Sequence, residues 1–223
     1  MILYRSPTLK TKQAISPVAT MAEQDWFVTN EGQCREAEVM PQDEDLLRPY
    51  RLYRFLTDLE DILERVQDDQ VRLTLIRPLV RRLLNSSEWL QLNFLPPDPT
   101  TGWSILMLYN EPDFPITIQN VVWSPGSVSP IHNHATWGIV ALLSGQEKNT
   151  FWQRSHTPDH PDRIQPVGEC LLNPGDILCL MPEAIHQVEA MGDEPTISFN
   201  LYGETNFNQR FEFDLEHRTA QVF

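Results

Sequence analysis

The sequence is poor in basic residues and has no long apolar run. Lysine and arginine together number 17, against 31 acidic residues, which gives a formal net charge of −14. A nucleic-acid backbone or an anionic membrane surface would therefore repel the chain overall. No apolar run approaches the roughly 20 residues needed to span a bilayer, and the opening stretch of residues 1–5 is too short for the apolar part of a signal peptide. We expect a cytoplasmic protein that binds neither nucleic acid nor membrane.

Cysteine is also scarce. Cys34, Cys170 and Cys179 have spacings that match no zinc ribbon, and any disulfide scheme would leave one of them unpaired. Cys179 lies in an apolar run, where a cysteine most often behaves as a small buried hydrophobic residue. Reduced thiols are therefore the favoured interpretation.

The chain is expected to consist of an N-terminal arm and one domain. Residues 1–42 show neither a helical nor a strand period, which predicts a flexible N-terminal arm with one segment, around residues 26–28, that could be held in place. A single domain is expected over residues 43–223, with a helical part over 43–95 and a β-barrel over 96–223.

Apolar residues recur at steps of three and four over residues 46–63 and again over 71–84, the pattern of amphipathic helices. A third short helix is expected near Ser87, whose hydroxyl would cap it. The second stretch carries arginines between its apolar residues, and we interpret them as a solvated helix face. They are Arg72, Arg77, Arg81 and Arg82.

From residue 96 the character changes to short runs rich in Ile, Val, Leu and aromatic residues, separated by Pro, Gly, Asn and Asp. Many short strands at such spacing predict a sandwich or a barrel. The expected strands cover residues 104–109, 116–123, 138–143, 148–154, 168–172, 176–180, 186–190 and 196–202.

Three histidines form the candidate site. His132 and His134 are two positions apart on an extended chain, so their side chains point to the same face. About fifty residues later, a turn over residues 173–176 and an apolar strand lead to His186. Three imidazoles without a carboxylate could hold Fe, Zn, Ni or Cu, and the number of imidazoles does not choose among these metals.

An isolated pair of alternate histidines is more often a surface feature than a metal site, but its surroundings favour a metal here. Gly126 and Gly145 flank the pair, and the third histidine follows a proline by four positions. His156, His160 and His217 lie in polar or terminal surroundings and are interpreted as solvent-exposed.

The spacing of Gly126, His132, His134 and Gly145 resembles the first motif of the cupin superfamily. In that motif a glutamate follows the histidine pair, and Gly138 stands at the corresponding position here. The resemblance therefore implies a site of three histidines and no carboxylate.

The second cupin motif is matched more loosely. Pro182 and His186 are present, but Ala184 stands where glycine is expected and the spacing is one residue shorter. The resemblance implies a mainly β fold, a cupin double-stranded β-helix or jelly-roll barrel, with the N-terminal α-helices packed on it.

Within the superfamily, the loss of the carboxylate resembles the cysteine dioxygenase family, whose members are thiol dioxygenases. Residues 123–138 are most similar to its bacterial mercaptopropionate dioxygenase branch, and the similarity extends from about residue 46 to 212. It implies Fe(II) on His132, His134 and His186, with Zn and Ni as alternatives. The implied partners are a small-molecule thiol and O2, and the product is a sulfinic acid.

The family's Ser-x-His-x-Tyr strand corresponds to Ser198, Asn200 and Tyr202. The resemblance implies a catalytic role for these residues, with the Tyr202 phenol near the metal. Asn200 replaces the family's histidine; an amide can orient a phenol by hydrogen bonding but cannot exchange a proton at neutral pH. Because Gly138 also stands at the position of the thioether-forming cysteine of the animal enzymes, no Cys–Tyr crosslink is expected.

The family binds its substrate's carboxylate with Arg or Gln, and the corresponding stretch, residues 103–109, contains neither. Arg210 and Arg154 are the remaining candidates to balance an anion, and Trp137 is the third predicted substrate-binding residue. Surface arginines are the commoner explanation of both. If neither faces the pocket, the substrate would be neutral or cationic.

Two other functions stay open. One is a cupin with zinc or nickel that acts on a carbonyl compound. The other is a metal-stabilised binding or regulatory cupin without turnover, which the presence of Asn200 and the missing arginine in residues 103–109 make credible. The chain could be a monomer or a homodimer, because the predicted helices could cover a sheet edge that would otherwise pair.

Overall fold

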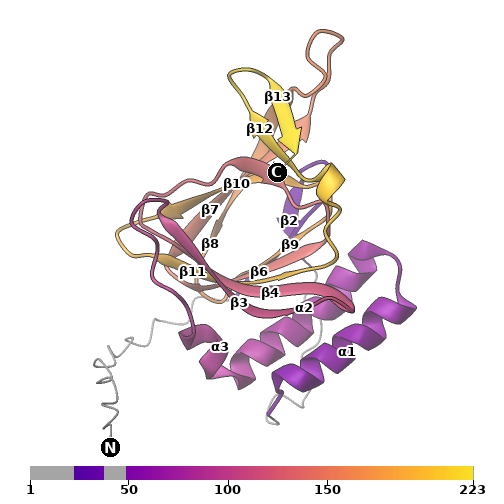
Figure 1. The fold of residues 1–223 in the computed structure, drawn as a ribbon, viewed down its shortest axis with the longest axis vertical. Coiled ribbons are helices and arrows are strands. Elements are labelled where there is room, and N and C mark those ends of the chain that lie inside the picture. Colours follow the sequence, from indigo (N-terminus) through magenta and orange to yellow (C-terminus); the bar gives the residue numbers. More distant parts are fainter. Residues whose placement is uncertain (1–22, 38–48, 223) are drawn as a thin grey trace, which may run out of the picture.

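The computed structural model describes residues 23–37 and 49–222. Within them, two sheets face each other as the walls of a barrel (Figure 1). The seven-stranded sheet has the order β2-β1-β9-β6-β11-β4-β3, and the six-stranded sheet has the order β13-β12-β5-β10-β7-β8. This arrangement confirms the predicted mainly β fold, a cupin double-stranded β-helix with N-terminal helices.

Each of the eight strands expected from the sequence is present, with ends shifted by a few residues. They are β3 (Trp103–Glu111), β4 (Phe114–Trp123), β6 (Gly138–Ser144), β7 (Gln146–Arg154), β8 (Ile164–Leu172), β9 (Ile177–Leu180), β10 (Ile185–Met191) and β11 (Thr196–Tyr202). Sequence reasoning did not find the short strands β2 (Cys34–Glu36), β5 (Ile131–Asn133), β12 (Phe211–Asp214) and β13 (Thr219–Val222). Runs of three or four residues contain too little alternation to be recognised.

Three helices cover the outer face of the seven-stranded sheet (Figure 1): α1 (Leu52–Arg65), α2 (Asp69–Ser86) and α3 (Glu88–Leu92). Their apolar stripes pack against the sheet in one buried cluster, in which Phe55 and Leu59 from α1 join Phe199 and Leu201 from β11. The prediction that Ser87 caps α3 was wrong. The Ser87 hydroxyl instead donates a hydrogen bond to the carbonyl of Tyr50 (3.2 Å), because the loop before α1 lies against the start of α3.

The interpretation of the α2 arginines as a solvated face was also wrong. Arg77 is only 4% exposed and its Nε lies 2.9 Å from the Asp25 carboxylate. Arg81 pairs with both Asp25 and Glu23, and the Arg82 guanidinium lies over the ring of Tyr50. These arginines are paired because α2 packs on the sheet next to residues 23–25 and to the loop that contains Tyr50.

The strand β1 (Asp25–Val28) runs parallel to β9 and antiparallel to β2. The prediction of a flexible arm was therefore wrong for residues 23–37, which contribute two strands to the sheet, whereas the segment expected to be held in place coincides with β1. The rest of the predicted arm, residues 1–22 and 38–42, lies outside the described residues. The other domain boundaries stay predictions.

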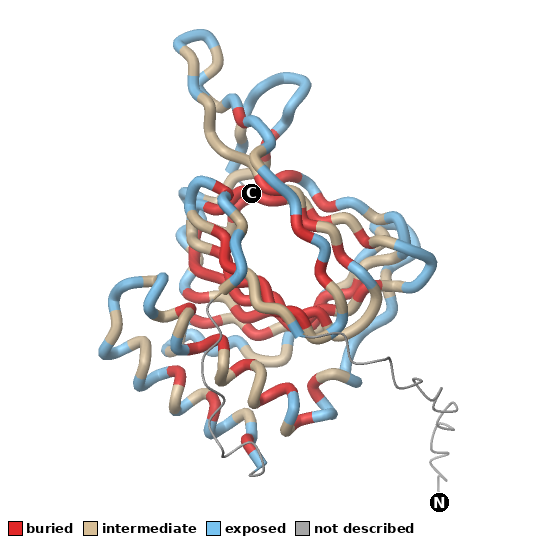
Figure 2. Tube along the Cα trace, turned by 180° about the vertical axis from the view of Figure 1, so that it is seen from behind, coloured by how far each residue is buried: buried red, intermediate tan, exposed pale blue. Residues whose placement is uncertain are grey.

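Alternation along β11 shows how the fold positions the site. Phe199 and Leu201 point toward the helices and are fully buried, whereas Ser198, Asn200 and Tyr202 point into the barrel. Figure 2 shows that buried residues are concentrated on the barrel walls and exposed residues in the loops. None of the described helices is long and apolar enough to cross a membrane.

Candidate metal centre

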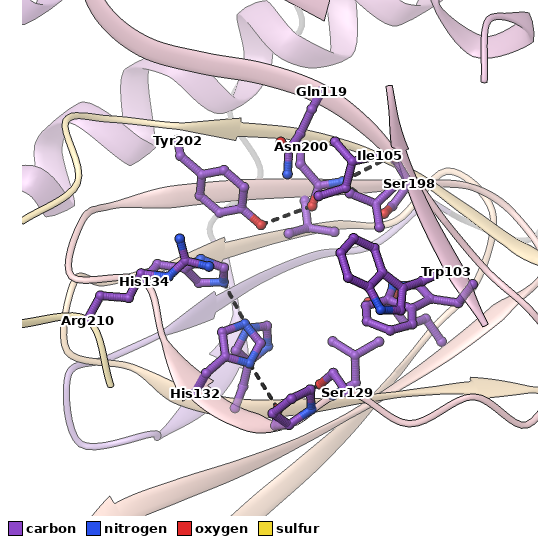
Figure 3. Close-up of a pocket in the computed structure, with 17 residues that line it drawn as sticks. Trp103, Ile105, Gln119, Ser129, His132, His134, Ser198, Asn200, Tyr202 and Arg210 are labelled. Carbon is purple, nitrogen blue, oxygen red and sulfur yellow. Dashed lines mark hydrogen bonds between the residues drawn. The ribbon is translucent and has the colours of Figure 1, made fainter. Parts of the chain in front are cut away.

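Three histidines meet at one end of the barrel interior. His132 on β5 lies directly opposite His186 on β10 in the antiparallel pairing of these strands, and His134 follows β5. Their candidate ligand nitrogens all lie within 4.8 Å of one another, and Nε2 of His134 is 3.0 Å from Nε2 of His186 (Figure 3). Two nitrogens that bind one metal at about 2.1 Å and at a right angle are about 3 Å apart. This spacing therefore fits a shared ion.

The ring orientations of two of these histidines are set by oxygen acceptors. Nδ1 of His132 lies 3.0 Å from the Pro130 carbonyl oxygen, and Nδ1 of His186 lies 2.8 Å from Oδ1 of Asn149. A proton on each Nδ1 leaves the Nε2 lone pair for a metal, which is the usual arrangement around ligating histidines.

Burial also keeps the three imidazoles neutral, because it lowers the pKa of each histidine. It lowers the pKa of His132 to about 4 and lowers the pKa values of His134 and His186 well below the usual range, where nearby positive charge adds to the effect. Neutral imidazoles bind metals, so the residues present fit a divalent transition metal such as Fe or Zn.

The Tyr202 ring packs directly on the backbone at Gly138. A Cβ atom at Gly138 would lie 2.8 Å from two ring carbons of Tyr202. Real Cβ contacts are essentially never that short, so the Tyr202 ring occupies the space where a side chain at position 138 would begin. A cysteine or glutamate at this position would require Tyr202 to move.

Tyr202 lies next to the histidines. Its ring stacks on His134 with a centroid distance of 4.4 Å and an interplanar angle of 23°, and its hydroxyl donates to Oδ1 of Asn200 (3.1 Å). Nδ2 of Asn200 in turn donates to the carbonyl (3.1 Å) and Oγ (2.9 Å) of Ser198. Burial and the charge of Glu147 raise the pKa of Tyr202, so the phenol stays protonated. The three residues predicted on this strand form one hydrogen-bonded column (Figure 3).

A second column, on β7, was missed by sequence reasoning. Oε1 of Glu147 accepts a hydrogen bond from Nδ2 of Asn149 (2.9 Å), and Asn149 holds His186. Glu147 is only 2% exposed, and this burial raises the pKa of its carboxyl to about 7. Polar residues at alternate positions before the inward-facing Phe151 were the signal in the sequence that could have found this column.

The Ser198, Asn200 and Tyr202 column, Glu147 and the three histidines line a cavity of about 230 Å³ inside the barrel. Arg210, one of the predicted substrate-binding residues, lines it beside His134 (Figure 3). Gln119 on β4 lines it as well and was not predicted, because it lies ten residues beyond the stretch, residues 103–109, that corresponds to the family's substrate-binding residues. The remaining wall is largely apolar and includes Trp103, Ile105, Val121, Trp123, Val140 and Val188.

The other two predicted substrate-binding residues are not among the side chains that line this cavity. Trp137 is buried in the cluster between the helices and the sheet. The Arg154 guanidinium lies over the rings of Phe211 and Phe213, 5.3 and 5.0 Å from their centroids. These positions argue against substrate contact by either residue.

The remaining histidines lie away from the cavity. His156 and His217 are exposed, as expected, and His160 is half-buried. His217 contacts Asp214 (2.7 Å), and His160 contacts Arg218 (2.8 Å). None of them approaches the candidate metal centre.

No protein-family profile matches the chain. Solved structures that resemble it include a double-stranded β-helix protein from Klebsiella pneumoniae, with 15% identity over 52% of this chain and 83% of that chain and a TM-score of 0.41. A cupin superfamily protein from Desulfitobacterium hafniense has 14% identity over 51% of this chain and 84% of that chain, with a TM-score of 0.38.

An oxalate oxidase in complex with the substrate analogue glycolate has 12% identity and a TM-score of 0.36, over 52% of this chain and 61% of that chain. The match thus spans about three fifths of the oxalate oxidase chain, and similarity at this level carries no statement about activity. The two facing sheets and the clustered imidazoles are features of the chain itself: it has the cupin fold, with a three-histidine cluster that could hold a metal ion.

Proposed function

We propose that the protein is a non-haem iron thiol dioxygenase that converts a small thiol and O2 into a sulfinic acid. The observation that carries the proposal is the composition of the candidate metal centre: its candidate ligands in the described residues are three imidazoles and no carboxylate, and the Tyr202 phenol stacks on one of them. This combination agrees with the resemblance of residues 123–138 to thiol dioxygenases.

His132, His134 and His186 would hold the iron, which when bound supplies the redox chemistry that adds both atoms of O2 to the substrate's sulfur. The protein's own contribution is to bind and orient the substrate in a cavity with largely apolar walls. Enclosure of this kind excludes water and holds the reacting groups close together.

Arg210 supports a substrate that carries a carboxylate. Its guanidinium is permanently charged and can form two parallel hydrogen bonds with a carboxylate. Gln119 also lines the cavity and offers an amide that can donate to the same group. An anionic thiol is therefore favoured over the neutral or cationic substrate that would follow if no such residue faced the cavity.

Tyr202 supports a role in orientation near the reacting sulfur. Its hydroxyl is a protonated donor held by Asn200, so it can turn from this acceptor to a substrate or oxygen atom in the cavity. Asn200 cannot relay a proton as a histidine would. The proposal therefore gives Tyr202 the task of hydrogen bonding rather than of proton exchange through Asn200.

The test first loads the protein with Fe(II) under anaerobic conditions. Oxygen consumption is then measured after air-saturated buffer and a thiol are added. We expect one iron per chain, uptake of O2 with 3-mercaptopropionate, and a sulfinic acid product identified by mass spectrometry. Propanethiol, which lacks the carboxylate, should react at least tenfold more slowly, because one charge-assisted hydrogen bond contributes about 1.5–3 kcal/mol. His186→Ala should lose iron and activity, whereas the matched variant His217→Ala, at an exposed histidine, should retain both.

Metal analysis of protein purified without added metal separates the alternatives. Stoichiometric zinc together with no O2 uptake on any thiol would contradict the proposal and favour a cupin with another reaction. Tight thiol binding in calorimetry without O2 consumption would favour a binding protein, the alternative to which Asn200 lends support.

A further inference from the structure

Two cysteines that are far apart in the sequence meet where the two sheets come together. Cys34 lies on β2, an edge strand of the seven-stranded sheet, and Cys170 lies on β8, an edge strand of the six-stranded sheet. Both are free thiols, and Cys34 packs against the buried apolar cluster to which Cys170 belongs. The two side chains therefore share one cluster, although 135 residues separate them in the sequence.

The surroundings hold the two thiols together. Cys170 belongs to a buried apolar cluster that includes Val28 and Val140, and Cys34 packs against the same cluster. The turn between β1 and β2 is pressed against the six-stranded sheet: a Cβ atom at Gly32 would lie 2.7 Å from the carbonyl oxygen of Trp152. Packing this close leaves the turn little freedom to carry Cys34 away from β8.

The two thiols differ in exposure and acidity. Cys34 is partly exposed, whereas Cys170 is only 6% exposed. The neighbouring Cys170 thiol lowers the pKa of Cys34, while Cys34 and burial raise the pKa of Cys170. An accessible thiol of lowered pKa beside a second, buried thiol is the arrangement of an attacking and a resolving cysteine.

We propose that Cys34 and Cys170 form a reversible disulfide bond when the protein meets a small-molecule disulfide such as glutathione disulfide. The Cys34 thiolate attacks one sulfur of the small disulfide and releases one thiolate. The Cys170 thiol then gives up its proton to the released glutathione thiolate, and its sulfur attacks the Cys34 sulfur in the mixed disulfide and releases the second thiol. Two protein thiols are oxidised to one disulfide, and the small disulfide is reduced to two thiols.

This bond would join the outer strands of the two sheets and close a loop that contains most of the chain. Closing so long a loop is expected to stabilise the folded protein. Val140 lies both in the apolar cluster around Cys170 and in the cavity wall, so the bond would form beside the candidate site. The inference does not depend on the reaction proposed for that site.

The experiment treats the folded full chain with glutathione disulfide, unfolds it in denaturant with iodoacetamide to block the remaining thiols, and maps peptides by mass spectrometry. We expect a Cys34–Cys170 peptide, one alkylated cysteine at Cys179, and a higher melting temperature that dithiothreitol reverses. Cys179→Ser is the matched control, because it removes a cysteine outside the pair and should leave the crosslink unchanged.

The two single variants separate the steps. The Cys170→Ser variant should accumulate glutathione on Cys34. The Cys34→Ser variant should carry no glutathione on Cys170, since Cys170 is buried. Three alkylated cysteines in the wild-type protein after treatment would overturn the proposal. So would a stable glutathione adduct on wild-type Cys34 without the crosslinked peptide, because it would mean that Cys170 does not resolve it.

Discussion

Two hydrogen-bonded columns lie beside the candidate metal centre, one on each sheet, and each has an asparagine at its centre. On the six-stranded sheet, Asn149 accepts from the ligand candidate His186 and donates to Glu147. On the seven-stranded sheet, Asn200 accepts from Tyr202 and donates to Ser198. The same amide group orients a candidate metal ligand in one column and a phenol in the other.

The columns differ in what lies at their far ends. The first ends in a buried carboxyl with a pKa raised to about 7, whereas the second ends in a hydroxyl and a backbone carbonyl, which do not titrate. A change of pH near neutrality should therefore act on the Glu147 column and leave the Ser198 column unchanged. Each prediction below changes one column and asks whether the other responds.

The largest effect is expected from Glu147→Gln. The carboxyl has a pKa near 4.5 when unfolded and about 7 when folded, so the folded state binds the extra proton between these values. The free energy of unfolding contributed by this group therefore falls as pH rises, by about 3 kcal/mol in total. Denaturation at pH 4.5 and pH 8 should show the variant gaining about 3 kcal/mol relative to wild type between the two.

Glu64→Gln, at an exposed position on α1, is the control and should show no such trend. A difference between Glu147→Gln and wild type that stays constant with pH would mean that Glu147 is ionised in the folded protein. The contrast between a titrating and a non-titrating column would then be lost.

Asn149→Ala is expected to have the next largest effect. The substitution removes the acceptor that holds the His186 ring, and loss of such a partner typically weakens metal binding about 10- to 100-fold. Competition with a chelator measures this directly. Equal losses of affinity in Asn149→Ala and Asn200→Ala would contradict the assignment of different tasks to the two amides.

Asn200→Ala is expected to have the smallest effect. It removes one hydrogen bond of the Tyr202 hydroxyl, a contribution of about 1 kcal/mol, so thiol-dependent O2 uptake should fall by roughly fivefold. Metal affinity should not change, because the hydrogen bonds of Asn200 in the described residues go to Ser198 and Tyr202 and not to a histidine. A loss of bound metal in this variant would show that the two columns are coupled.

Local patterns were sufficient for eight of the strands and for the candidate metal centre. Alternation of apolar residues located β4 and β11, and the two-residue spacing of His132 and His134 placed both imidazoles on one face because strand side chains repeat every two residues. The spacing of the α2 arginines could not reveal their burial, since their acidic partners lie on a segment more than fifty residues away.

By itself, then, the sequence determined the mainly β architecture, the helices before it and the three histidines, all of which depend on periodicity within single segments. Only the tertiary structure decided that Glu147 and Gln119 share the cavity with them and that Cys34 packs against the cluster that contains Cys170. The physical reason is that periodicity specifies which face of a strand a side chain occupies. Which side chains meet across the barrel depends on how the strands are ordered and paired.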